Sequence, residues 1–131
     1  MSMLSAILIL SNASGVLLFE KNIKNIEYDS KIFSGLLIAV QSVCREINIG
    51  ECNTFGSENY QVLTAKANYV VVALIVDKNS SYAEDYWELI AFEIGEEFEK
   101  NYNLKEFKGR ISQFKNFNQI LNNFLITKGL I

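Results

Sequence analysis

The chain has 131 residues, a net charge of -3, and neither histidine nor proline. Its length predicts a single domain spanning residues 1–131, and its 50% hydrophobic content excludes intrinsic disorder. The acidic balance gives no electrostatic support for binding nucleic acid. The absence of histidine removes the commonest general base and the commonest neutral metal ligand. Composition therefore points away from disordered, nucleic-acid-binding and histidine-dependent catalytic proteins.

A nearly continuous apolar run at residues 4–10 predicts a first strand that is covered on both faces. The turn-forming residues 11–15 separate it from a second strand at 16–21, and the short spacing predicts a hairpin. The opening lacks the basic region of a signal peptide, and no run reaches the roughly 20 residues of a membrane span. We expect a cytoplasmic protein that reaches membranes only through partners.

Residues 29–47 predict a helix, with Asp29 or Ser30 placed to cap its start. Between Lys31 and Arg45 this segment carries no charged residue. An outer face that is small and weakly apolar suits a second surface lying against it, although burial within the monomer remains the alternative. The inner face has helical spacing: Phe33, Leu36, Leu37, Val40, Val43, Cys44 and Ile47.

Three further strands are predicted at residues 51–55, 60–65 and 69–76, and the last is the most apolar. The first and fifth strands are the most apolar, so we expect them side by side at the centre, which gives the order 2-1-5-4-3. Alternation along the fifth strand assigns residues to the two helical layers. We expect one layer to receive Val70, Val72 and Leu74, and the other Val71, Ala73 and Ile75.

The pattern from Ser81 to Glu84 reads as a capping box, which predicts the start of a second helix. The outer face of this helix is acidic, which is typical of a solvated helix surface. A last helix is predicted at about 116–128. The resulting fold class is α+β, an antiparallel five-stranded sheet with one helix on one face and the C-terminal helices on the other.

Sequence motifs for catalysis are absent. The glycines form no phosphate-binding loop, and no serine or cysteine lies in a nucleophile motif. Cys44 and Cys52 match no zinc pattern and are interpreted as small buried hydrophobic residues. We therefore expect a protein that is not an enzyme and that needs no cofactor and no metal.

The element order resembles that of the longin-domain family, within the wider longin and roadblock group. The resemblance covers nearly the whole chain and is carried by LSAILILSNASGVLLFEK, FSGLLIAVQSVCREI, YQVLTAKANYVVVALIVDK, YWELIAFEIGEEFEKNY and FNQILNNFL. Such domains are non-catalytic interaction modules of trafficking adaptors, SNAREs, the signal-recognition-particle receptor and regulators of small Ras-like GTPases. Because no coiled-coil heptads or membrane anchor follow, the chain looks like a stand-alone longin domain of an archaeal kind.

The resemblance implies a dimerising module, homomeric or with a related domain, that docks a small Ras-like GTPase or a trafficking-type adaptor. On the uncharged helix we expect a docking face made of Gly35, Ile38, Ser42 and Arg45, in which the small residues allow close approach. The second strand lies at a sheet edge in the predicted order, and an apolar edge invites another strand. The expected dimer edge comprises Val16, Leu17, Leu18 and Phe19.

A small-molecule-sensing, PAS-like regulatory domain is the alternative, because such domains also place helices on an antiparallel sheet. A sensor needs a cavity between sheet and helix, lined by a few converging polar groups. The sheet-facing positions here are bulky and apolar, which favours a filled core. Stabilisation by a metabolite in a thermal-shift screen would support the sensor.

Overall fold

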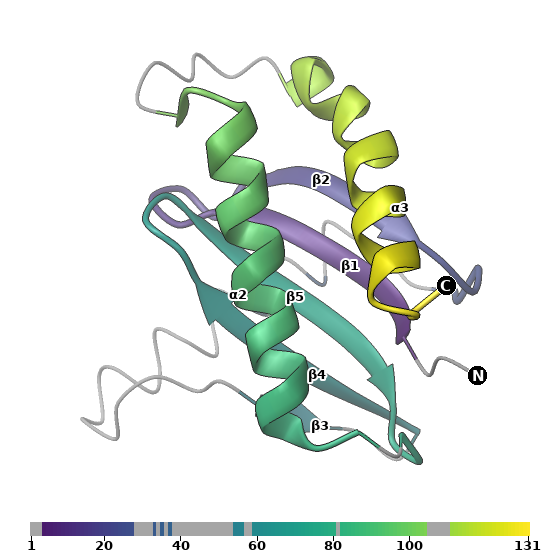
Figure 1. Cartoon of the computed structure of the whole chain (residues 1–131). Coiled ribbons are helices and arrows are strands. Elements are labelled where there is room, and N and C mark those ends of the chain that lie inside the picture. Colours follow the sequence, from purple (N-terminus) through teal and green to yellow (C-terminus); the bar gives the residue numbers. More distant parts are fainter. Residues whose placement is uncertain are drawn as a thin grey trace.

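A computed structural model describes residues 4–27, 33, 35, 37, 54–56, 59–80, 82–104 and 111–131. Five strands precede the C-terminal helices (Figure 1). The elements are β1 (Leu4–Ser11), β2 (Leu17–Asn22), β3 (Thr54–Gly56), β4 (Tyr60–Lys66), β5 (Val70–Asp77), α2 (Glu84–Asn101), the 3-10 helix η2 (Ile111–Asn116) and α3 (Phe117–Thr127).

The strands form one antiparallel sheet in the order β2-β1-β5-β4-β3, which is the order predicted from their apolarity. β1 and β5 lie at the centre, and β1 is buried without interruption from Leu4 to Leu10. A central strand is covered on both faces by other layers, so it needs apolar side chains at successive positions rather than at alternate ones. The α+β class is confirmed.

Helices α2 and α3 lie on the same face of the sheet (Figure 1). Their buried side chains, among them Trp87, Phe98 and Phe117, form one core with the residues of β1 and β5 that point toward them. This core includes Val70, Val72 and Leu74, as the alternation of β5 predicted.

The opposite face of the sheet carries a second, smaller core. Ala73 and Ile75 of β5 belong to it together with Leu37, and Phe33 packs against it. Phe33 and Leu37 are helical and lie one turn apart, so these two members of the predicted inner face pack on this side. The other members lie outside the described residues: Leu36, Val40, Val43, Cys44 and Ile47. Val71 of β5 is only half-buried.

The predicted capping box at Ser81 and Glu84 is wrong, because α2 begins only at Glu84. The N-cap is Ala83, an extended residue that makes no side-chain cap bond. The hydroxyl of Ser80 instead accepts hydrogen bonds from the backbone N–H of Tyr82 at 3.3 Å and from the indole of Trp87 at 3.1 Å. The residues that precede α2 are therefore held by a hydrogen bond to a buried aromatic residue.

Helix α3 ends in a glycine-dependent cap. Gly129 has φ 72°, and its N–H donates to the carbonyl of Ile126 at 3.0 Å. The N–H of Leu130 donates to the carbonyl of Leu125 at 2.8 Å, which completes a Schellman motif. Leu130 is fully buried, so the cap turns the chain back into the core that α3 covers.

Candidate functional site

Of the four residues of the predicted docking face, the structure describes only Gly35. Gly35 is exposed, and a Cβ built on it would meet nothing within 4 Å. Two residues later, Leu37 is only 3% exposed and packs on the sheet. The helix thus has a buried inner side and an accessible outer side at this point. The other predicted members of the face lie outside the described residues: Ile38, Ser42 and Arg45.

Three members of the predicted dimer edge belong to β2, which lies at the end of the sheet with β1 as its neighbour, whereas Val16 immediately precedes that strand. Its apolar side chains are mostly used inside the chain. Leu18 and Phe19 are 5% and 9% exposed, and the ring of Phe19 packs edge to face on that of Phe117 with centroids 5.4 Å apart. Leu17 is half-buried, whereas Val16 is 47% exposed. Val16 is the member of this set with the most side-chain surface left for a partner.

The outer surface of α2 carries two large apolar residues that the sequence had not singled out. Leu89 and Phe92 are 53% and 41% exposed. They lie opposite the buried stripe of the helix that contains Trp87, Ile94 and Phe98. Helical periodicity places both residues on the outer face of the helix, but the many carboxylates around them are typical of a solvated surface.

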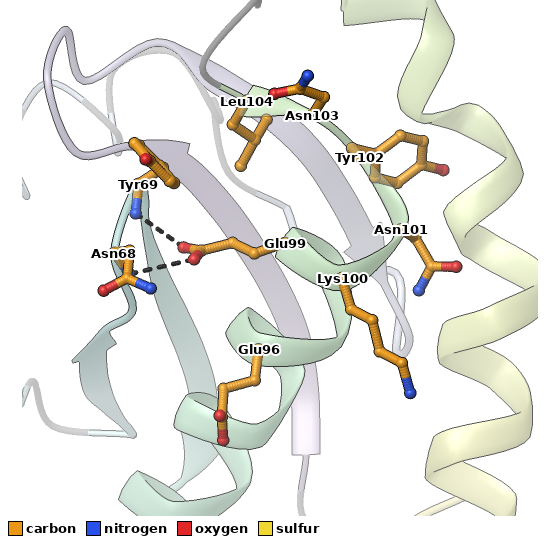
Figure 2. A pocket seen from close by; sticks show the side chains of 9 residues that line it. All are labelled: Asn68, Tyr69, Glu96, Glu99, Lys100, Asn101, Tyr102, Asn103 and Leu104. Carbon is orange, nitrogen blue, oxygen red and sulfur yellow. Dashed lines mark hydrogen bonds between the residues drawn. The ribbon is translucent and has the colours of Figure 1, made fainter.

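A hollow of about 540 Å³ opens at the C-terminal end of α2, beside the turn between β4 and β5 (Figure 2). Glu99 reaches across to this turn, where its carboxylate accepts hydrogen bonds from the backbone N–H groups of Asn68, Tyr69 and Val70 at 3.2, 2.8 and 3.2 Å. The carboxylate is therefore committed to holding the turn. The hollow is lined by Asn68, Tyr69, Glu96, Glu99, Lys100, Asn101, Tyr102, Asn103 and Leu104.

Tyr102, at the wall of this hollow, belongs to the aromatic cluster under α2 and α3. Its ring lies 5.0 Å from that of Phe98 and 4.9 Å from that of Phe114, centroid to centroid. Burial raises the pKa of the Tyr102 phenol above its ordinary value, and a hydrogen bond with the backbone of Phe117 acts in the opposite direction. Packing thus favours the neutral form of the phenol.

A second hollow, of about 390 Å³, adjoins the turn between β1 and β2 and is lined in part by Tyr69 and Leu104, as is the first. The two turns are tied together, because the N–H of Asn12 donates to the carbonyl of Tyr69 at 2.8 Å. Both hollows thus lie at one end of the sheet rather than between the sheet and α2.

In the parts of the chain that the structure describes, no helix has the length and apolarity to cross a bilayer. The same residues contain no group of three or more His, Cys, Asp or Glu side chains that could hold a metal ion.

Similar proteins are found by structure rather than by sequence. No protein-family model matches the chain, and no curated protein matches it either. A structure described as MglB with tetrameric arrangement superposes with a TM-score of 0.53 and 10% identity, over 77% of this chain and 82% of that one. Myxococcus xanthus MglB gives a TM-score of 0.52 and 16% identity, over 74% of this chain and 85% of that one.

The gliding protein MglB from Thermus thermophilus gives a lower TM-score of 0.43, with 10% identity over 73% of this chain and 72% of that one. At these identities the first two likenesses concern the fold alone. They support the longin-like fold class that the sequence predicted.

Proposed function

We propose that the protein is a non-catalytic interaction module that resembles longin domains and docks a small Ras-like GTPase or a trafficking-type adaptor. One observation carries the proposal: Gly35 is open to solvent on a helix whose Leu37 is buried in the core. The outer side of that helix can therefore meet a partner without rearrangement of the sheet. The class of partner comes from the resemblance of the sequence to longin domains.

Close backbone approach is the role proposed for Gly35 on this face. A glycine lets the backbone of a partner or its side chains come nearer than any other residue would. Ile38 would then serve as the apolar anchor, Ser42 as a second small contact and Arg45 as part of the polar rim. A partner bound in this way would cover a surface that carries no charge between Lys31 and Arg45.

Dimerisation is the second part of the proposal. β2 is an edge strand with one neighbour in the sheet, and an edge of this kind is a template for pairing with another chain. One solved structure of the same fold is described with a tetrameric arrangement, which is a property of that MglB. We infer that this chain, too, associates, through β2 of two copies across a two-fold axis.

The experiment introduces a large side chain at Gly35, where the open surroundings allow it without destabilising the fold. Gly35→Arg should melt at the wild-type temperature or slightly above it, because there is space around this position and glycine is a poor helix former. Binding to small Ras-like GTPases of the native host, loaded with GDP or with a GTP analogue, should weaken at least tenfold. Gly35→Ala, which adds one methyl group, is the matched control and should bind as wild type does.

Calorimetry on the purified pairs gives the readout, together with a pull-down from host lysate that includes adaptor proteins. A folded Gly35→Arg variant that binds each recovered partner as tightly as the wild type would place the docking face elsewhere. Failure of the wild type to bind any GTPase or adaptor protein, combined with stabilisation by a metabolite, would overturn the interaction module itself.

A further inference from the structure

The outer face of α2 presents an apolar pair to solvent. Leu89 and Phe92 are three residues apart, so their side chains are neighbours on the helix surface. They are 53% and 41% exposed, and they lie on the side of the helix that is farthest from the sheet. Scattered single apolar residues are normal on protein surfaces, whereas adjacent large ones form a patch that a partner can cover.

Carboxylates occupy the positions one turn away from this pair. Asp85 precedes Leu89 by one turn, and Glu96 follows Phe92 by one turn. The other two positions four residues away from the pair are Glu88 and Glu93. An apolar centre within a polar rim is the ordinary anatomy of a protein interface. The rim positions that α2 itself contributes are all acidic, so they favour a partner of the opposite sign.

The charge of α2 supports the same conclusion. Acidic residues stand one turn apart at Glu84 and Glu88 and again at Glu93 and Glu97, and like charges at this spacing destabilise a helix. The only basic residue within α2 is Lys100. The chain shows how a cation meets this face, because Lys128 of the α3 C-cap lies 3.1 Å from the carboxylate of Glu93. A cationic partner would add further pairs of this kind at the exposed carboxylates of Asp85 and Glu96.

We propose that the outer face of α2 is a second docking surface, and that it receives a cationic amphipathic segment of a partner protein. The segment would set apolar side chains on Leu89 and Phe92 and place lysine or arginine side chains over the surrounding carboxylates. α2 and Leu37 pack on opposite faces of the sheet. A partner on α2 and a partner on the helix at 29–47 can therefore bind at the same time. This surface stands independently of the function proposed above.

The probe is a synthetic helical peptide with leucine at positions i, i+3, i+4 and i+7 and with lysine on both flanks. Fluorescence anisotropy should show saturable binding to the wild-type chain, at least tenfold tighter than binding of a scrambled peptide of the same composition. Leu89→Ser/Phe92→Ser should weaken binding at least tenfold. Ile126→Ser is the matched control, because Ile126 is 60% exposed on α3 and lies outside the surface.

A second variant tests the rim and does not depend on the apolar pair. Glu88→Lys/Glu96→Lys should also weaken binding at least tenfold, and higher salt should weaken binding of the wild type. Circular dichroism verifies that each variant is folded, and if one is not, the other supplies the result. If the scrambled peptide bound as tightly as the designed one, the proposal would be overturned, because charge attraction alone would then explain the binding. Wild-type self-association that Leu89→Ser/Phe92→Ser abolishes would also overturn it, since a second copy would then be the occupant.

Discussion

At the scale of single residues, Glu99 joins parts of the chain that are distant in sequence. Three consecutive backbone N–H groups at the turn between β4 and β5 converge on its two oxygens, and Figure 2 shows the bonds from Asn68 and Tyr69. Backbone N–H groups need acceptors, and here the carboxylate supplies them. A charged acceptor makes stronger hydrogen bonds than a neutral one. Glu99 thereby connects α2 to the start of the central strand β5.

We predict that Glu99→Gln destabilises the protein by about 1 kcal/mol, because the amide retains one acceptor oxygen and loses the charge. Urea denaturation measures the loss, and hydrogen exchange at Tyr69 should quicken. Glu96→Gln is the control, because Glu96 lines the same hollow but is exposed. Equal stability of the two variants would show that Glu99 does not hold the turn.

Tyr102 gives a prediction for alkaline pH. Its pKa is raised in the folded protein, mainly by burial, so the unfolded chain ionises first, near the ordinary value of 10.0. Stability that is fully present below this pH should therefore fall as the pH rises toward the higher pKa of the folded state. Tyr102→Phe should start from a lower stability, since the bond to Phe117 is lost, and should show a flatter decline.

Urea denaturation at several pH values between 8 and about 11 measures this difference in slope. Tyr82→Phe serves as the control, because Tyr82 is 42% exposed. Identical slopes for wild type and Tyr102→Phe would exclude Tyr102 as the group responsible.

At the scale of elements, the packing of α2 on the sheet depends on Gly95. A Cβ at this position would lie 3.2 Å from the Cβ of Ala67 and 3.3 Å from Cγ2 of Val72. Both distances are shorter than ordinary contact between carbon atoms. The absence of a side chain therefore sets how closely the helix approaches β5. Gly35 is the opposite case, because its surroundings are open.

We predict that Gly95→Leu costs roughly 1–3 kcal/mol through overpacking, even though leucine is the better helix former by nearly 1 kcal/mol. Gly35→Leu should be neutral or stabilising, since there the gain in helix propensity meets no steric cost. Thermal melts of the two variants beside the wild type provide the comparison. A Gly95→Leu variant as stable as Gly35→Leu would mean that the helix shifts freely on the sheet.

Strand positions could be read from the sequence because apolar runs determine them. The predicted 4–10 and 69–76 correspond to β1 (Leu4–Ser11) and β5 (Val70–Asp77), and the turns between strands have the expected polar residues. The start of α2 could not be read in this way. The pattern from Ser81 to Glu84 predicted a cap, but the N-cap is Ala83. The residues before the helix are held instead by the hydrogen bond from the indole of Trp87 to the hydroxyl of Ser80, which a capping pattern does not include.

The candidate site was predictable only in part. The exposed position of Gly35 followed from helical periodicity, and so did the burial of Leu37. The edge position of β2 followed from the apolarity of the other strands. The burial of Phe19 did not, because its ring packs on Phe117, nearly a hundred residues away along the chain. Helical periodicity predicts the exposure of Leu89 and Phe92, but the surrounding carboxylates drew attention to the charge of the face instead.

At the scale of the whole molecule, both faces of the sheet are covered by helical residues, and β2 forms one of its edges. Partners that meet the helical layers from outside and a copy that pairs at β2 would occupy different surfaces. Self-association can therefore be tested without disturbing either helical layer. Val16 is the position for this test, because Leu18, at 5% exposed, cannot be changed without damage to the core.

We predict that the wild-type chain sediments as a dimer at high micromolar concentration and that Val16→Asp sediments as a monomer. Two aspartates facing each other across a two-fold axis repel, and Val16 is exposed enough to accept a charge in the monomer. Ile126→Asp is the control on α3 and should remain dimeric. A monomeric wild type under these conditions would contradict pairing through β2.

The central pairing of β1 with β5 also determines when the molecule can fold. Leu10 pairs with Val71 and Ile7 pairs with Leu74, although β2, β3 and β4 lie between these residues in the sequence. During synthesis the β1–β2 hairpin leaves the ribosome before β5 does. The edge of β1 that pairs with β5 stays unpaired until β5 has been made. Distant pairing of this kind slows folding and leaves an apolar edge open meanwhile. Nascent chains that stop before β5 should therefore bind chaperones or aggregate, whereas chains that include β5 can close the sheet.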